Sequence, residues 1–223
     1  MDSRLARKPR QAWWLAALVA GCPLAAAQHV RAIATESIVP GASTDATHEL
    51  RISLHVFSES RWVTTDIHAA VKAAASLLAQ CGVDSTAQLH EVQAPRRFHF
   101  YSTRISRELL RDLPTSKPAV FFVEDNLNRP AFDAEAIGRA NAATRPELAD
   151  TIWIAHGARD LGVTLAHELV HVLADSGAHS DAPDNLMRAE TAPGNIVLSR
   201  AQCSGLRMRG EAKGLLTPRV LKP

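Results

Sequence analysis

Two histidines flank a glutamate in the stretch His167-Glu168-Leu169-Val170-His171, which has the form H-E-x-x-H. An α-helix advances by about 100° per residue, so side chains four positions apart lie one above the other on one face. The two imidazoles can therefore converge on one point and supply half of a tetrahedral zinc site. Glu168 lies beside them, where its carboxylate can take a proton from a water molecule on the metal. The pattern predicts a hydrolase that uses zinc, with Glu168 as the general base.

The neighbouring residues predict an amphipathic helix that can hold this motif. Leu161, Leu165, Leu169 and Val172 recur at helical spacing and form an apolar stripe for a core. Asp160 precedes them and is a suitable N-cap. H-E-x-x-H alone also occurs in ordinary helices, where the His and Glu side chains bind nothing. The zinc site is therefore a hypothesis that needs support from residues outside the motif.

The residues after the motif resemble the metzincin clan of zinc metallopeptidases. They include Gly177, His179 and Met187, and in that clan a glycine, a third His and a Met come in this order. The resemblance implies a peptidase with Zn²⁺ as cofactor and a protein or peptide as substrate. It implies that the Met lies in a tight turn under the metal and that the Glu is the general base. It also implies three zinc ligands, which here are His167, His171 and His179.

The third histidine comes two residues later than in the clan pattern H-E-x-x-H-x-x-G-x-x-H. Ala174 stands at the position of the clan's glycine, and Gly177 stands at the position of its third His. We expect the helix to continue to Ser176 and to end at Gly177, which suits a left-handed C-cap. The late turn would then bring the late His179 back to the metal. The competing ligands are four acidic residues, Asp175, Asp181, Asp184 and Glu190.

The rest of the sequence predicts an α+β fold. Alternating apolar residues over 50–56 are typical of a half-buried strand, and the continuous apolar run over 119–123 is typical of an interior strand. Further strands are expected over 87–92, 98–101 and 151–155, and helices over 63–80, 106–113 and 199–210. This order is similar to the metzincin upper subdomain, in which a twisted mixed sheet is backed by two long helices. The helix over 199–210 adds a small C-terminal helical part. Residues 124–149 are polar and predict a long surface segment beside a substrate cleft.

The first residues predict export rather than fold. Four basic residues precede a short apolar run, and Ala25-Ala26-Ala27 provides a cleavage site, as in a secretory signal peptide over 1–27. The competing prediction is a lipid anchor at Cys22, because residues 19–22 resemble a bacterial lipobox. The apolar run is too short for a good membrane span. Residues 28–48 are expected to be a flexible leader, 49–210 the zinc metallopeptidase domain, and 211–223 a frayed tail.

The charge of the mature chain excludes a basic surface for nucleic acid. Removing residues 1–27 takes four of the 25 basic and one of the 23 acidic residues, which leaves a net charge of −1. No basic run remains, so no nucleic-acid partner is expected.

Either route of processing leaves Cys81 and Cys203 as the remaining pair of cysteines. In the periplasm or outside the cell they are expected to form a disulfide, and the alternative is two separate buried thiols.

Three functions are compatible with these features. The first is an exported zinc metallopeptidase that cleaves internal peptide bonds. The second is a non-catalytic envelope protein that keeps the helix as a zinc-binding or scaffold element. Glu168 disfavours it, because a structural site needs no base. The third is a zinc hydrolase that acts on a non-peptide amide.

Overall fold

A computed structural model describes residues 29–41, 45–127, 136–138 and 146–219 of the 223-residue chain. The predicted signal peptide and Cys22 lie outside these residues. The four helices of the described residues are α1 (Thr64–Ala79), α2 (Thr103–Asp112), α3 (Leu161–Ala174) and α4 (Arg200–Ala212). The strands are β1 (Arg31–Ile38), β2 (His48–Phe57), β3 (Val83–Gln93), β4 (Phe100–Tyr101), β5 (Ala119–Val123), β6 (Asp125–Asn126), β7 (Ala136–Gly138), β8 (Thr151–Ala155) and β9 (Leu216–Pro218).

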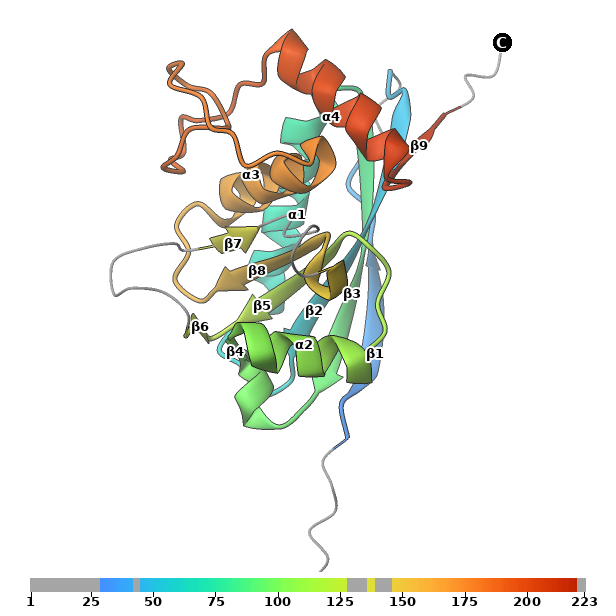
Figure 1. Cartoon of the computed structure of the whole chain (residues 1–223), viewed down its shortest axis with the longest axis vertical. Helices are drawn as coiled ribbons and strands as arrows, with labels where there is room; N and C mark the ends of the chain where they lie inside the picture. The colour runs from blue at the N-terminus through green and yellow to red at the C-terminus, as the bar shows by residue number, and fades with distance from the viewer. Residues whose placement is uncertain (1–28, 42–44, 128–135, 139–145, 220–223) are drawn as a thin grey trace, which may run out of the picture.

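A twisted mixed sheet forms the centre of the molecule (Figure 1). Its strand order is β1-β3-β2-β5-β8-β7, and β9 pairs with the first residues of β2. Strands β3, β2, β5 and β8 are parallel to their neighbours in this series, while β1, β7 and β9 pair antiparallel. The parallel strands β5 and β8 are buried on both faces, which accounts for their uninterrupted apolar runs.

Helices α1 and α3 pack against one face of the sheet and against each other. Leu50, Ile52, Leu54 and Val56 alternate along β2 and point into this core. The apolar residues of α1 and α3 are buried against them, as their helical spacing predicts. The predicted sheet backed by two long helices is therefore confirmed, and α4 adds the C-terminal helical part across one end (Figure 1).

The opposite face of the sheet carries a second, aromatic core. Phe57, Phe121 and Trp153 project from neighbouring strands, and Phe98 and Tyr101 pack against them together with α2. Helix α2 begins at the cap Ser102, whose hydroxyl accepts a hydrogen bond from the N–H of Ile105. The strand predicted over 98–101 is wrong in its first half, because residues 96–99 form a 3₁₀ turn and only Phe100 and Tyr101 pair with β6.

Two segments that the sequence places outside the domain are ordered parts of the sheet. Residues 31–38 of the expected flexible leader form β1, and His48 begins β2. All but one of the β1 side chains are exposed, so this edge strand is held by backbone hydrogen bonds and has no apolar pattern to reveal it. The expected frayed tail is also wrong for residues 211–218. Leu215 and Leu216 are buried, and β9 pairs with β2.

Helix α3 ends earlier than predicted. It stops at Ala174, and Asp175 takes the left-handed conformation (φ 48°) that the sequence predicts for Gly177. Aspartate is one of the few non-glycine residues that adopt this conformation. At the other end, Asp160 is the N-cap residue as predicted, but its side chain makes no capping hydrogen bond within the described chain. None of the described helices has the length and apolar character that a membrane span requires.

Candidate metal centre

Three imidazoles meet beside α3. Ligand nitrogens of His167, His171 and His179 all lie within 4.8 Å of one another. The ring centroids of His167 and His171 are 4.6 Å apart, and His179 lies 5.4 Å from the first and 5.0 Å from the second. His167 and His171 are buried, whereas His179 is exposed. The helix therefore supplies two nitrogens from within the protein, and the following loop supplies a third from the solvent side.

Backbone carbonyls determine which nitrogen of each buried imidazole carries the proton. His167 Nδ1 lies 2.8 Å from the carbonyl oxygen of Leu186, and His171 Nδ1 lies 2.6 Å from that of Ser176. A carbonyl can only accept, so both Nδ1 atoms donate. In the neutral rings each Nε2 then carries the lone pair. This is the second-sphere arrangement that orients histidine ligands in metal sites.

The two Nε2 atoms face each other at 2.9 Å. With both protons on Nδ1 this contact cannot be a hydrogen bond, because two lone pairs meet. Such an approach is favourable only when a cation shares them. Two nitrogens at the zinc–nitrogen distance and the tetrahedral angle are about 3.3 Å apart, close to this separation. The three-imidazole donor set therefore fits zinc.

Burial keeps His167 neutral near pH 7. The loss of solvent lowers the pKa of His167, and the neighbouring His179 lowers it further, while the hydrogen bond to Leu186 acts in the opposite direction. A lowered pKa keeps the imidazole unprotonated, and only this form binds a metal.

The chain after α3 returns to the metal centre through two short connections. Asp175 reverses the chain, and the Ser176 N–H donates to the carbonyl of His171 at 3.1 Å. The N–H of Ser180, directly after His179, donates to the carbonyl of Met187 at 2.7 Å. His179 thus reaches the cluster although the helix ends two residues earlier than expected.

Residues 185–188 form a β-turn next to His167, which we call the Met turn. The N–H of Arg188 donates to the carbonyl of Asn185 at 3.2 Å and closes it. Leu186 and Met187 are both buried in the main core. The Leu186 carbonyl accepts from His167, and the Met187 carbonyl accepts from Ser180. The turn is therefore hydrogen-bonded to the ring of His167 and to Ser180, the residue that follows His179.

The other predicted site residues have clear positions. Glu168 follows His167 on α3 and is 8% exposed. Asp175 lies 3.4 Å from Lys213 Nζ. Among the described residues, the three histidines are the only group of His, Cys, Asp and Glu side chains placed to hold a metal. The competing acidic ligands are exposed, and none belongs to the cluster: Asp175, Asp181, Asp184 and Glu190.

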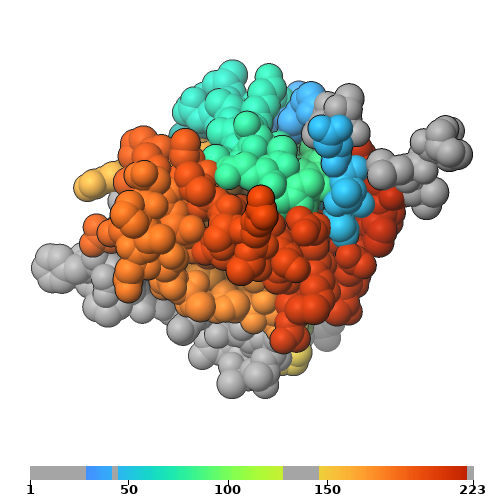
Figure 2. Space-filling model, turned by 90° about the horizontal axis from the view of Figure 1, so that it is seen from above, coloured from blue at the N-terminus to red at the C-terminus, as the bar shows by residue number. Residues whose placement is uncertain are grey.

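A disulfide joins Cys81 to Cys203, with their Cα atoms 4.8 Å apart. Cys81 follows α1 and Cys203 lies within α4, so the bond ties the two helices together. Seen from above, α4 and the loop before it form one surface beside the end of α1 (Figure 2).

Sequence reasoning missed two residues near the disulfide, Asn185 and Gln202. The capping pattern of Ser199 and Gln202 marks Gln202 as a capping residue but gives no sign of its pairing with Asn185.

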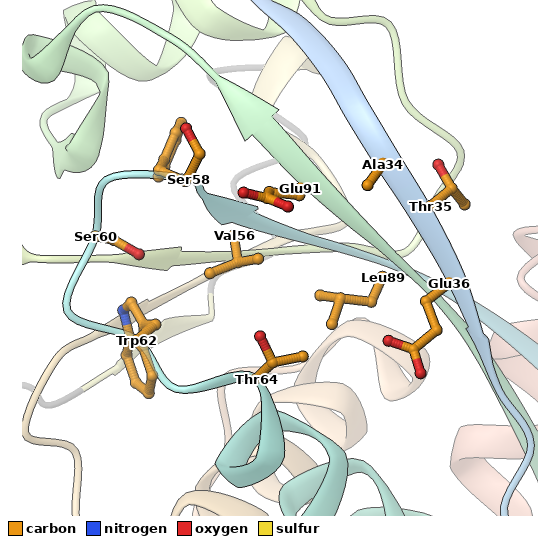
Figure 3. Close-up of a pocket in the computed structure, with 11 residues that line it drawn as sticks. Ala34, Thr35, Glu36, Val56, Ser58, Ser60, Trp62, Thr64, Leu89 and Glu91 are labelled. Carbon is orange, nitrogen blue, oxygen red and sulfur yellow. The ribbon is translucent and has the colours of Figure 1, made fainter.

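Three pockets lie among the described residues. One of about 280 Å³ opens between β1, β2 and β3, where Glu36, Glu91 and Trp62 are among its lining residues (Figure 3). Others of about 810 Å³ and 620 Å³ lie at Lys117 and at Gly162. None of the three includes the histidines of the cluster.

Comparison with known proteins identifies the fold. No family model matches the sequence, and no curated protein matches it. The structure is similar to archaemetzincin from Methanopyrus kandleri, with a TM-score of 0.51 and 12% identity over 73% of this chain and 96% of that one. It is also similar to metalloproteinase-II from Bacteroides fragilis, with a TM-score of 0.50 and 17% identity over 78% of this chain. The match spans 57% of that second protein. The chain thus has the metzincin-like fold that its sequence resembles.

Proposed function

We propose that the protein is an exported zinc metallopeptidase that cleaves internal peptide bonds of a protein or peptide. The observation that carries this proposal is the approach of the Nε2 atoms of His167 and His171 to 2.9 Å, while both Nδ1 atoms are bonded to backbone carbonyls. His179 lies beside them as the third ligand. An acidic residue of the same buried helix, Glu168, completes the set. The metzincin-like fold supports the same conclusion.

Each residue has one task in the proposed reaction. His167, His171 and His179 would hold zinc through one ring nitrogen each. Zinc, when bound, lowers the pKa of a water in its open position to about 7 and polarises the substrate carbonyl. The Glu168 carboxylate takes a proton from the attacking water and passes it to the amine that leaves. Met187 supports the ligands from below through the backbone of its turn.

The sheet offers a place for an extended substrate. Among the described strands, β7 is the last on its side of the sheet, and it contacts α3. The backbone groups of an edge strand can pair with an extended peptide, which would then run along the metal helix. The disulfide between Cys81 and Cys203 supports the exported location, because such bonds persist in oxidising compartments.

An activity measurement tests the proposal. The wild-type protein should cleave an unstructured protein such as reduced, alkylated casein, and a zinc chelator should abolish cleavage until zinc is restored. Glu168→Gln should keep zinc and lose about 10²–10⁴-fold in rate, because the amide has the shape of the carboxylate without its basicity. Glu190→Gln is the matched control at an exposed site, and its rate should equal that of wild type. A Glu168→Gln variant that cleaves at the wild-type rate would exclude Glu168 as the base.

The same measurements, with small acyl-amide substrates added, distinguish the peptidase from the two competing functions. A non-catalytic zinc-binding protein would contain zinc and leave every peptide intact. A zinc hydrolase of non-peptide amides would release product from small acyl-amide substrates but would not cut casein. Either outcome contradicts the peptidase proposal while leaving the metal centre in place.

A further inference from the structure

The position of the Met turn decides whether two histidines can reach the metal together. His167 is oriented by the Leu186 carbonyl at 2.8 Å. The loop segment that carries His179 is attached at Ser180 to the Met187 carbonyl at 2.7 Å. Both carbonyls belong to consecutive residues of one turn. A displacement of this turn would therefore rotate one imidazole and move another.

The side chain of Asn185 fixes the turn from within. It is 4% exposed, and its Oδ1 atom accepts a hydrogen bond from the Met187 N–H at 2.9 Å. Its amide also pairs with that of Gln202 on α4. Asn185 Nδ2 donates to Gln202 Oε1 at 3.0 Å, and Gln202 Nε2 donates to Asn185 Oδ1 at 3.0 Å. Each side-chain amide carries both a donor and an acceptor, so the two residues satisfy each other with this reciprocal pair of hydrogen bonds.

Gln202 is in turn held firmly by its own helix. Its Oε1 atom accepts from the N–H of Ser199 at 2.8 Å, and the Ser199 hydroxyl accepts from the Gln202 N–H at 3.2 Å, which forms a capping box. The next residue, Cys203, is bonded to Cys81 at the end of α1. Gln202 therefore offers Asn185 an anchor that cannot shift without moving α4.

We propose that Asn185 and Gln202 are positioning residues of the metal centre, through which α4 sets the affinity for zinc. This inference rests on the proposed function, because it takes the three histidines as the zinc site. Neither amide lies in the histidine cluster itself. They act on the metal through the Met turn and the Leu186 carbonyl. Groups in this second sphere typically change metal affinity by about 10- to 100-fold.

The test measures zinc affinity by competition with a chromogenic chelator, on the full chain with its disulfide intact. Gln202→Leu removes both hydrogen bonds to Asn185 and should weaken zinc binding by about 10- to 100-fold. Gln202→Glu keeps the acceptor for Asn185 Nδ2 but sets a carboxylate oxygen against Asn185 Oδ1, so it should also weaken zinc binding. The visible absorption of bound Co²⁺, which reports ligand geometry, should change in Gln202→Leu.

Two control variants separate positioning from general stability. Ser199→Ala removes the capping hydroxyl of α4 and leaves the amide pair intact. Gln80→Leu removes an amide whose side chain bonds to Ile196 and Leu198 of the same loop but does not touch the Met turn. Both should keep wild-type zinc affinity and the wild-type Co²⁺ spectrum, even if their thermal midpoints fall.

Zinc affinity in Gln202→Leu that equals wild type would overturn the inference and leave the peptidase proposal standing. The same holds if Ser199→Ala weakens zinc binding as much as Gln202→Leu, since stability of α4 would then be the cause. A wild-type protein that binds neither zinc nor Co²⁺ would overturn both proposals.

Discussion

Gly162, in the first turn of α3, lies against α1 without space for a side chain. A Cβ atom at this position would lie 2.5 Å from the Cβ of Ala73 and 3.4 Å from the carbonyl oxygen of Ala70. Non-bonded carbon atoms prefer about 3.5–4.0 Å, so Gly162→Ala would force the two helices apart. This contact sets how closely the helix that carries His167 and His171 approaches the core.

The expected change in the free energy of unfolding of Gly162→Ala results from two opposing effects. Alanine favours a helix over glycine by up to about 1 kcal/mol, whereas overpacking a well-filled contact costs about 1–3 kcal/mol. We therefore expect Gly162→Ala to lower the free energy of unfolding by up to about 2 kcal/mol. The matched control is Gly205→Ala in the middle of α4, where an added Cβ meets nothing within 4 Å. That variant should gain up to about 1 kcal/mol.

Urea unfolding of four variants measures the contact directly. In the double variant Gly162→Ala with Ala73→Gly, the obstructing methyl group is gone, so the double should be more stable than the sum of the single changes predicts. The coupling free energy should be about 1–3 kcal/mol. Additivity within about 0.5 kcal/mol, or a Gly162→Ala variant as stabilised as Gly205→Ala, would refute the close approach of α3 to α1.

Two other perturbations test the framework around the site. Replacing Cys81 and Cys203 by Ser should cost about 4–5 kcal/mol of unfolding free energy in the chain-entropy model, given their sequence separation of 122 residues. A loss below about 1 kcal/mol would contradict that model for this chain. Burial lowers the pKa of His55 from 6.5 to about 3, and His90 and Lys117 contribute. The unfolded chain therefore binds the proton first, and stability falls as the pH drops below 6.5. Between pH 7 and pH 5 this amounts to about 2 kcal/mol, which His55→Gln should remove from the pH dependence of urea unfolding. An unchanged pH dependence in His55→Gln would count against the buried, neutral imidazole.

The helices and strands that carry the site can be predicted from the sequence because their apolar residues recur in regular patterns. The spacing of Ile67, Val71, Ala74 and Leu78 predicts α1, and its buried face is the one expected. The apolar runs of β5 and β8 match the strands over 119–123 and 151–155. His167 and His171 share a helix, so their four-residue spacing alone brings them together.

Features that depend on contacts with distant parts of the chain cannot be predicted from local sequence patterns. Strand β1 exposes nearly all its side chains, and only its pairing with β3 reveals it. Glycine favours the left-handed conformation and so predicts the end of α3 at Gly177, yet Asp175 adopts that conformation with Lys213 nearby. The pairing of Asn185 with Gln202 joins residues from two segments, and no local pattern predicts it.

The metal content of two variants beside wild type tests the central claim most directly. Purified wild-type protein should contain one zinc ion per chain, measured by mass spectrometry of the metal after dialysis. His179→Ala should lose most of this zinc, because it removes one of three ligands. Asp175→Ala should keep it, since Asp175 lies outside the cluster and pairs with Lys213. Zinc retained in His179→Ala and lost in Asp175→Ala, or a wild-type chain without zinc, would contradict the assignment of the three histidines as the zinc site.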